Sequence, residues 1–242
     1  MMKSSSFTRM FLPFSKPGFW LGIFLLTFNN LINFLPSAFH DKIYLWLNLC
    51  ALCLIWLWSR RYLNLTNVDL GWRKDNLARS LLLGLGLTVI IILLFLFLLW
   101  LLPIIGLNIG PPRLPIDSRL DLLWRIIICI PLGTALFEEV LFRGIFYGYL
   151  IRNVSTKKTV LVTSLFFALW HITAAFETVS YNFQIGAVLF GIGLWLIFLI
   201  SSFVAGLLFG WIRYKGRNIT GCILAHALIN SLSLVIIFWV WK

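Results

Sequence analysis

The sequence predicts an all-α protein, a polytopic transmembrane bundle of about seven to eight helices that forms one integral membrane domain over residues 1–242. Hydrophobic residues make up 61% of the chain and charged residues only 12%, about half the charged share of a soluble domain. The apolar residues gather in long uncharged runs, and about 20 such residues cross a bilayer. Twelve tryptophans fit the aromatic belts found at membrane interfaces.

Seven uncharged runs place the spans. We expect the fourth run to form one long helix, and the 106–117 stretch that precedes it to be a Pro-rich outer loop. The sixth run is too long for one straight helix, so part of it is predicted to be a loop or a re-entrant segment. The runs lie between Lys16 and Asp41, at 43–59, 80–103 and 122–151, between Lys158 and Glu177, within 178–212, and at 218–241.

The basic residues alternate between the connections. From the N-terminal segment to the C-terminal one, Lys and Arg number three, one, five, three, three, none, three and one. Cytoplasmic connections carry the excess of such residues, so we expect a cytoplasmic N-terminus and an outer C-terminus, in the plasma membrane. This distribution also accounts for the net charge of +12, and we therefore expect no nucleic-acid partner.

After Arg125 near its start, the fourth run holds three charges, all in the stretch LFEEVLFRGIFYG at 136–148. Each such charge at the centre of a membrane helix costs about 2.5–3.5 kcal/mol. Glu139 and Arg143 are four residues apart, so they share a helix face and can pair. Glu138 is rotated by about 100° from that face. The structural alternative is a buried salt bridge with a spare carboxylate, but a spare buried carboxylate is costly.

Two of the three histidines lie deep in other runs. His171 follows Phe167 by one helical turn, and His226 and Asn230 are four residues apart on one face. Taken alone, each of these side chains is compatible with a structural hydrogen bond between helices.

Depth in the membrane connects these groups. Counted from the predicted cytoplasmic end of its own helix, Glu138 lies thirteen residues deep, His171 thirteen, His226 nine and Asn230 thirteen. At about 1.5 Å per residue, all four lie roughly 14–20 Å from that face. A carboxylate, two imidazoles and an amide at one level indicate a site that activates water, and we expect it to open toward the cytoplasm.

The three motifs EEVLFR (138–143), FALWH (167–171) and HALIN (226–230) resemble a known signature. The signature is E-E-x-x-x-R, F-x-x-x-H and H-x-x-x-N on successive helices. It belongs to the CPBP family of intramembrane proteases, also called the Abi family, which includes the type II CAAX prenyl endopeptidases. The resemblance covers 122–241 and implies that this part is the catalytic core of an intramembrane endopeptidase.

The resemblance also implies roles for single residues. Glu138 and His171 would activate the attacking water, while His226 and Asn230 would polarise the scissile carbonyl and stabilise the oxyanion. The supporting residues would be Glu139, Arg143 and Phe167. The expected partners are a peptide or protein substrate at the membrane, and the lipid bilayer.

Two alternatives stay open from the sequence. Glu138, His171 and His226 are candidate ligands for a divalent metal such as zinc, since a carboxylate with two imidazoles is a catalytic zinc set; without an H-E-x-x-H motif we favour no metal cofactor. The second alternative concerns the function: the chain would be a non-proteolytic scaffold or immunity protein, or a proton or ion carrier that uses the same polar layer. A carrier would show polar residues across the whole membrane or inverted repeats, and the sequence shows neither.

Overall fold

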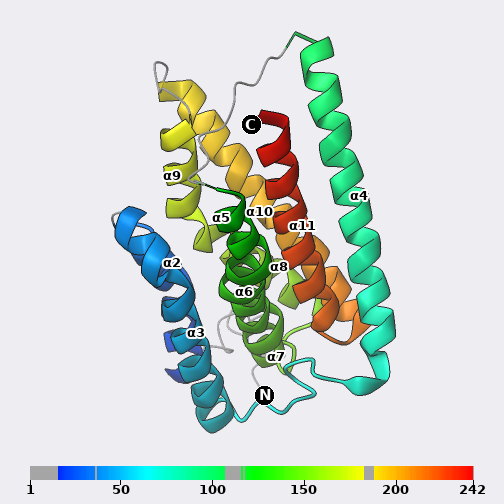
Figure 1. The fold of residues 1–242 in the computed structure, drawn as a ribbon. Coiled ribbons are helices and arrows are strands. Elements are labelled where there is room, and N and C mark those ends of the chain that lie inside the picture. Colours follow the sequence, from blue (N-terminus) through cyan, green and yellow to red (C-terminus); the bar gives the residue numbers. More distant parts are fainter. Residues whose placement is uncertain (1–15, 36, 107–115, 117, 183–187, 242) are drawn as a thin grey trace.

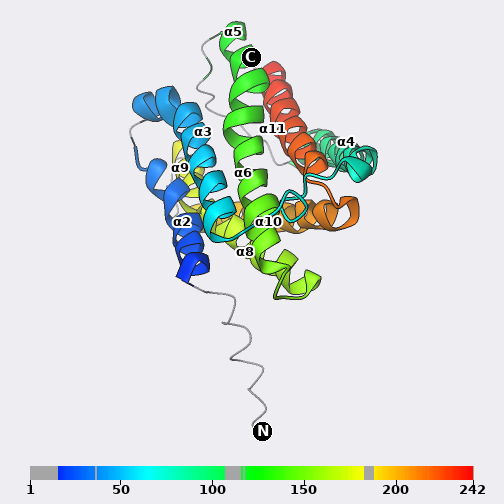
Figure 2. The same cartoon turned by 90° about the horizontal axis from the view of Figure 1, so that it is seen from below.

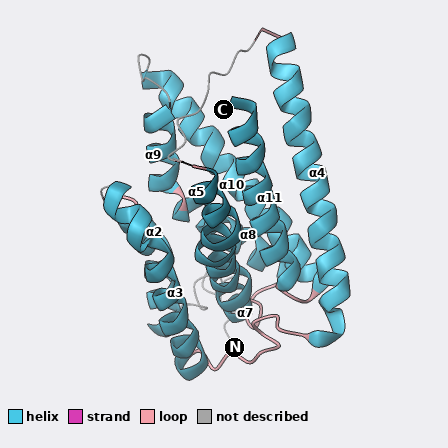
Figure 3. Ribbon diagram, viewed as in Figure 1, coloured by secondary structure: helices cyan, strands magenta, loops and turns pink. Residues whose placement is uncertain are grey.

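A computed structural model of the chain describes residues 16–35, 37–106, 116, 118–182 and 188–241, with the backbone alone at 16, 37–42 and 188–189. Every regular element in these residues is helical (Figure 3). The basic residues Lys3, Arg9 and Arg113, and most of the predicted outer loop at 107–115, lie outside the described residues.

The helices follow the seven predicted runs in order and form a helical membrane bundle, which confirms the fold class (Figure 1). By length and composition, five described helical segments can cross a membrane, or six if the bent pair α8 and α9 counts as one span. The apolar helix at Pro17–Ile32 is shorter than these segments. The elements are α2 (Lys16–Ile32), α3 (Ser37–Tyr62), η1 (Lys74–Asn76), α4 (Leu77–Ile104), α5 (Arg119–Trp124), η2 (Arg125–Leu136), α6 (Phe137–Glu139), η3 (Val140–Phe146), α7 (Tyr147–Leu150), α8 (Thr156–Trp170), α9 (Ile172–Asn182), α10 (Val188–Gly216) and α11 (Thr220–Trp241).

The fourth predicted run forms a continuous helix in the middle of the bundle (Figure 2), but it is not a uniform α-helix. Its segments η2 and η3 are π-helical and flank the short α6 that carries the Glu pair. Pro131 lies inside η2, and because proline has no N–H it interrupts an α-helical hydrogen-bond ladder. Every residue from 137 to 150 is buried, so the Glu pair lies in the packed centre of the protein.

The fifth predicted run is broken at His171, where α8 and α9 meet at a bend of 43°. A break inside a membrane exposes backbone groups that need new partners. Asn29 and Asn30 of α2 donate their side-chain amides, at 2.8 and 2.9 Å, to the two carbonyls that precede His171. Asn30 also accepts from the backbone N–H of Thr173 at 2.9 Å. The two asparagines therefore stabilise the break and fix the position of His171.

The sixth predicted window, 178–212, is divided between two helices. Its first residues belong to α9, and α10 begins at Val188 and continues to Gly216. α10 packs closely on α8 because Gly206 and Gly210 lie against Ser164 and Val160, where an added Cβ would come within 2.8 Å of either neighbour. This close packing brings α10 against the helix that carries His171.

The connection between α3 and α4 covers the end of the bundle that the sequence assigns to the cytoplasm. Arg152 donates to the Asp69 carboxylate at 2.6 Å, and Arg213 donates to the Asp69 carbonyl at 2.9 Å. Partial burial raises the pKa of the Asp69 carboxyl, but hydrogen bonds from Arg152 and Thr66 outweigh burial and leave that pKa below its ordinary value. The loop is thus held by charged hydrogen bonds as well as by the apolar packing of Leu65 and Leu70 in the core.

Candidate active site

Glu138 lies at the centre of the site with one oxygen engaged and one open. Its side chain is buried, and its Oε1 accepts a hydrogen bond from the indole N–H of Trp170 at 3.1 Å. Its Oε2 is buried and has no hydrogen-bond partner among the described residues. The atoms nearest to this oxygen on the two histidines are His171 Nε2 at 3.7 Å and His226 Nε2 at 4.0 Å. The structure therefore brings three of the four predicted catalytic residues together.

His171 presents its Nε2 to Glu138 because its other ring nitrogen is already engaged. Nδ1 lies 2.7 Å from the carbonyl oxygen of Phe167. A carbonyl oxygen only accepts, so Nδ1 carries the hydrogen, and Nε2 is an acceptor in the neutral ring. The Phe167 ring also packs edge-on against the imidazole, with the centroids 4.7 Å apart. Phe167 thus orients His171 with both its backbone and its side chain.

His226 has the same arrangement on the opposite side of Glu138. Its Nδ1 lies 2.8 Å from Oε1 of Glu139, and the Phe209 ring stacks on the imidazole at 5.2 Å. Since the carboxylate accepts, Nδ1 carries the hydrogen here too. Both neutral imidazoles would therefore turn a lone pair toward the open oxygen of Glu138.

Glu139 and Arg143 form the predicted pair. Glu139 Oε1 lies 3.0 Å from Arg143 Nη1, and the two side chains are 0% and 1% exposed. Arg143 also donates to the Gly206 carbonyl at 3.3 Å, and its guanidinium lies 4.3 Å from the centroid of the Phe167 ring. The sequence did not predict that Oε1 of Glu139, the oxygen that faces Arg143, also accepts a hydrogen bond from His226. The ion pair is therefore joined directly to the site.

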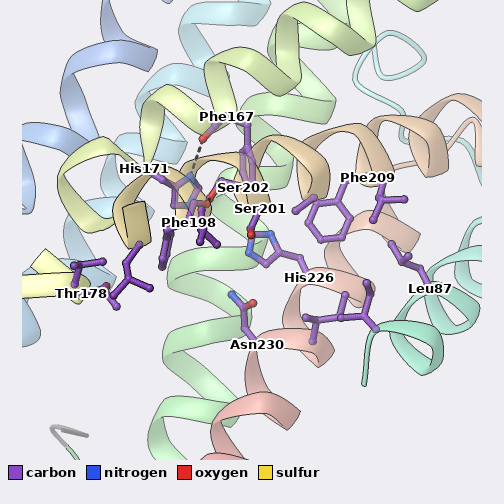
Figure 4. A pocket seen from close by; sticks show the side chains of 17 residues that line it. Leu87, Phe167, His171, Thr178, Phe198, Ser201, Ser202, Phe209, His226 and Asn230 are labelled. Atoms are coloured by element: carbon purple, nitrogen blue, oxygen red, sulfur yellow. Dashed lines mark hydrogen bonds between the residues drawn. The ribbon is translucent and has the colours of Figure 1, made fainter. Parts of the chain in front are cut away.

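Asn230 lies one turn after His226, and both line an apolar cavity of about 520 Å³ (Figure 4). The walls come from α4, α8, α9, α10 and α11, and polar groups gather where His171, His226 and Asn230 meet. The lining residues are Leu87, Ile91, Phe167, His171, Thr178, Val179, Leu194, Ile197, Phe198, Ser201, Ser202, Ala205, Leu208, Phe209, His226, Ile229 and Asn230.

The expected opening toward the cytoplasm stays a prediction, because the residues that line this cavity come from the interior of the bundle. Apart from His171, at the break between α8 and α9, its lining residues lie within helices, and the connections at 63–76, 151–155 and 217–219 contribute none. The α3–α4 connection, docked through Arg152 and Arg213, occupies that end of the bundle. The cavity instead extends from the histidines toward Thr178 and Leu194, near the other ends of their helices.

Trp170 and Phe209 are site residues that the sequence reasoning missed. Trp170 is fully buried and its ring lies 5.5 Å from Phe142 and 5.8 Å from Phe137. A buried indole N–H needs a hydrogen-bond partner. Because Trp170 directly precedes His171, its position in the sequence could have indicated that it belongs to the site. Phe209 gave none, because nothing in an apolar run distinguishes one phenylalanine from the next.

The candidate metal ligands do not form a ready three-ligand site as they lie. Two ligands of one tetrahedral zinc, each about 2.0–2.1 Å from the metal, are about 3.4 Å apart. The open oxygen of Glu138 is farther than this from both imidazoles, at 3.7 Å from His171 and 4.0 Å from His226. No group of three His, Cys, Asp or Glu side chains in the described part of the chain is placed to hold a metal ion.

Residues 120–232 match the family model described as type II CAAX prenyl endopeptidase Rce1-like. This region, less than half of the chain, is similar to the Rce1-like family of type II CAAX prenyl endopeptidases. The match confirms the family that the three motifs indicated, and the Rce1-like region includes every predicted site residue. It runs from α5 into α11, whereas α2, α3 and α4 lie outside it. A search of curated proteins and a search of solved structures each found no match to the chain.

Proposed function

We propose that the chain is an intramembrane endopeptidase, which hydrolyses a peptide bond in or near the membrane with a water activated by Glu138 and His171. The observation that carries this proposal is the open, buried oxygen of Glu138, which faces two imidazole nitrogens held as acceptors. A buried carboxylate oxygen without a donor is costly, and a water molecule supplies the missing donor. The Rce1-like match supports the same reaction class.

The attacking water would lie beside Glu138 and His171. Their facing atoms are 3.7 Å apart, too far for a direct hydrogen bond, so one water can donate to both. As the water oxygen bonds to the peptide carbon, the carbonyl electron pair moves to the carbonyl oxygen and a proton passes to Glu138. The C–N bond then breaks, and Glu138 returns that proton to the leaving amine nitrogen.

The oxyanion would form on the side of the apolar cavity, where His226 and Asn230 lie. Asn230 can donate from its amide. His226 already donates from Nδ1 to Glu139, so its Nε2 can donate to an oxyanion only when the ring carries both protons. In the neutral ring described above, His226 therefore orients the site and the Asn230 amide is the donor, while Glu139 would stabilise His226 if it took up a second proton; preorganised donors are a large source of transition-state stabilisation. Glu139 is therefore a positioning residue for His226 as well as the partner of Arg143.

The proposed substrate is a peptide or protein segment at the membrane, since the cavity beside the site is mostly apolar. We place the N-terminus in the cytoplasm on the alternation of basic connections, and we propose the plasma membrane as the location. The site itself then lies within the bilayer, where scarce water strengthens each polar contact.

Incubation of the purified protein in detergent with a peptide library tests the proposal. The wild type should release defined fragments and Glu138→Ala should release none. Glu177→Ala is the matched control, because Glu177 is exposed on α9, and it should cleave like the wild type. A folded wild type that cleaves no peptide would favour the scaffold or carrier alternative.

A further inference from the structure

A second cavity adjoins the site on the other side of His171. It has a volume of about 340 Å³ and lies between α2, α3, η2, α9 and α11. Glu138 lines only this second cavity, whereas His226 and Asn230 line only the apolar cavity. His171 lines both cavities. We call it the polar cavity, because six of its ten lining residues other than Glu138 and His171 have side chains with a heteroatom: Asn29, Asn33, Tyr44, Arg125, Cys129 and Thr134.

The polar cavity extends from Glu138 toward the end of the bundle opposite the basic connections. Arg125, at its far end, lies thirteen residues before Glu138 on the same continuous helix. That is roughly 15–20 Å at a rise of about 1.5 Å or somewhat less per residue. The Arg125 side chain is 26% exposed and pairs with Asp121 at 3.2 Å. A partly exposed ion pair thus lies at the far end and a buried carboxylate at the near end.

The polar cavity has both properties that water needs. Its volume of about 340 Å³ exceeds what about ten waters occupy at roughly 30 Å³ each. The open oxygen of Glu138 supplies a strong acceptor with no protein donor, and buried waters are found where such groups would otherwise stay unsatisfied. The apolar cavity offers few such groups away from the site, so it suits an apolar peptide segment better than a water chain.

We propose that the polar cavity holds and delivers the hydrolytic water, so that water and peptide reach the reacting centre from opposite sides of His171. This inference rests on the proposed peptidase function. It assigns the two cavities different reactants: water passes along the polar cavity to Glu138, and the peptide carbonyl approaches through the apolar cavity to His226 and Asn230. Ala174 on α9 lines the polar cavity and Ala205 on α10 lines the apolar cavity.

Native cysteines test whether the polar cavity is open to water without any need for activity. Cys129 lines this cavity, whereas Cys222 is buried among helices and hydrogen-bonds to Phe209. Two single-cysteine proteins, one keeping Cys129 and one keeping Cys222, are treated in detergent with a positively charged methanethiosulfonate, and labelling is read by mass spectrometry. The proposal expects Cys129 to be modified under conditions that leave Cys222 unmodified. An unmodified Cys129 would overturn it.

A matched pair of substitutions tests delivery. Ala174→Leu narrows the polar cavity and Ala205→Leu narrows the apolar one, and both positions are half-buried. We expect Ala174→Leu to lower kcat by roughly 10²-fold, the cost of a misplaced reactant, with KM within about twofold. We expect Ala205→Leu to raise KM instead. Equal kcat for Ala174→Leu and the wild type would overturn the water route while leaving the peptidase function intact. Labelled Cys129 in a protein that cleaves nothing would instead reject the peptidase function.

Discussion

Exchanging each adjacent glutamate for glutamine separates the carboxylate that holds the site from the one that reacts. Glu139 is fully buried and accepts from both Arg143 at 3.0 Å and His226 at 2.8 Å. Glu139→Gln leaves the Arg143 guanidinium buried without its counter-charge, which typically costs about 3–5 kcal/mol. For a chain of this size that corresponds to a melting temperature roughly 6–20 °C lower.

Glu138→Gln should behave in the opposite way. A glutamine oxygen can still accept from Trp170, as Oε1 of Glu138 does at 3.1 Å, and its amide can donate to the acceptor nitrogens of His171 and His226. The substitution also removes a buried charge, so this variant should melt at or above the wild-type temperature. Cleavage should nevertheless fall by about 10²–10⁴-fold, the usual contribution of a general base.

Both variants are melted and assayed for cleavage in the same detergent, with Glu177→Gln as the control for loss of an exposed carboxylate. We expect a stable, inactive Glu138→Gln and an unstable Glu139→Gln. A Glu138→Gln protein that cleaves near the wild-type rate, or an equal loss of stability in the two variants, would refute the separate roles of the two carboxylates.

Three further predictions concern metal, topology and pH. A strong chelator should leave cleavage intact, whereas loss of activity that zinc restores would point to the metal mechanism. A cysteine placed at Ser180 should react with a membrane-impermeant reagent added from outside and one placed at Ser155 should not, and the reverse pattern would reject the predicted orientation. Because the folded pKa of the Asp69 carboxyl lies below its ordinary value of 3.8, its ion pair with Arg152 stabilises the fold above that pH and loses this effect as the pH falls through the folded pKa. Asp69→Asn should therefore melt earlier than the wild type at neutral pH, with a gap that closes below about pH 3.8; a gap independent of pH would contradict this.

The features that the sequence predicts well are those set by local periodicity. Long uncharged runs place the helices because a membrane span needs a fixed length of apolar residues. The pairing of Glu139 with Arg143 follows from a spacing of four residues on one helix, and the structure shows it at 3.0 Å. The common depth of Glu138, His171 and His226 also follows from helical rise, and the three side chains meet.

The features that the sequence could not predict depend on contacts between distant helices. His226 lies 87 residues from the Glu139 carboxylate that holds it, and no periodicity encodes that contact. The break at His171 carries neither glycine nor proline, the usual signals, and is stabilised instead by Asn29 and Asn30 of another helix.

Isotope incorporation tests the central claim, hydrolysis by a water that Glu138 activates. Purified wild type cleaves a peptide in water enriched in ¹⁸O, and the mass of the new carboxyl terminus is compared with that from Glu138→Gln at the same protein concentration. The account predicts one ¹⁸O atom in the new carboxyl group made by the wild type, and a yield lower by about 10²–10⁴-fold from the variant. Unlabelled fragments, or labelled fragments formed equally fast by Glu138→Gln, would contradict it.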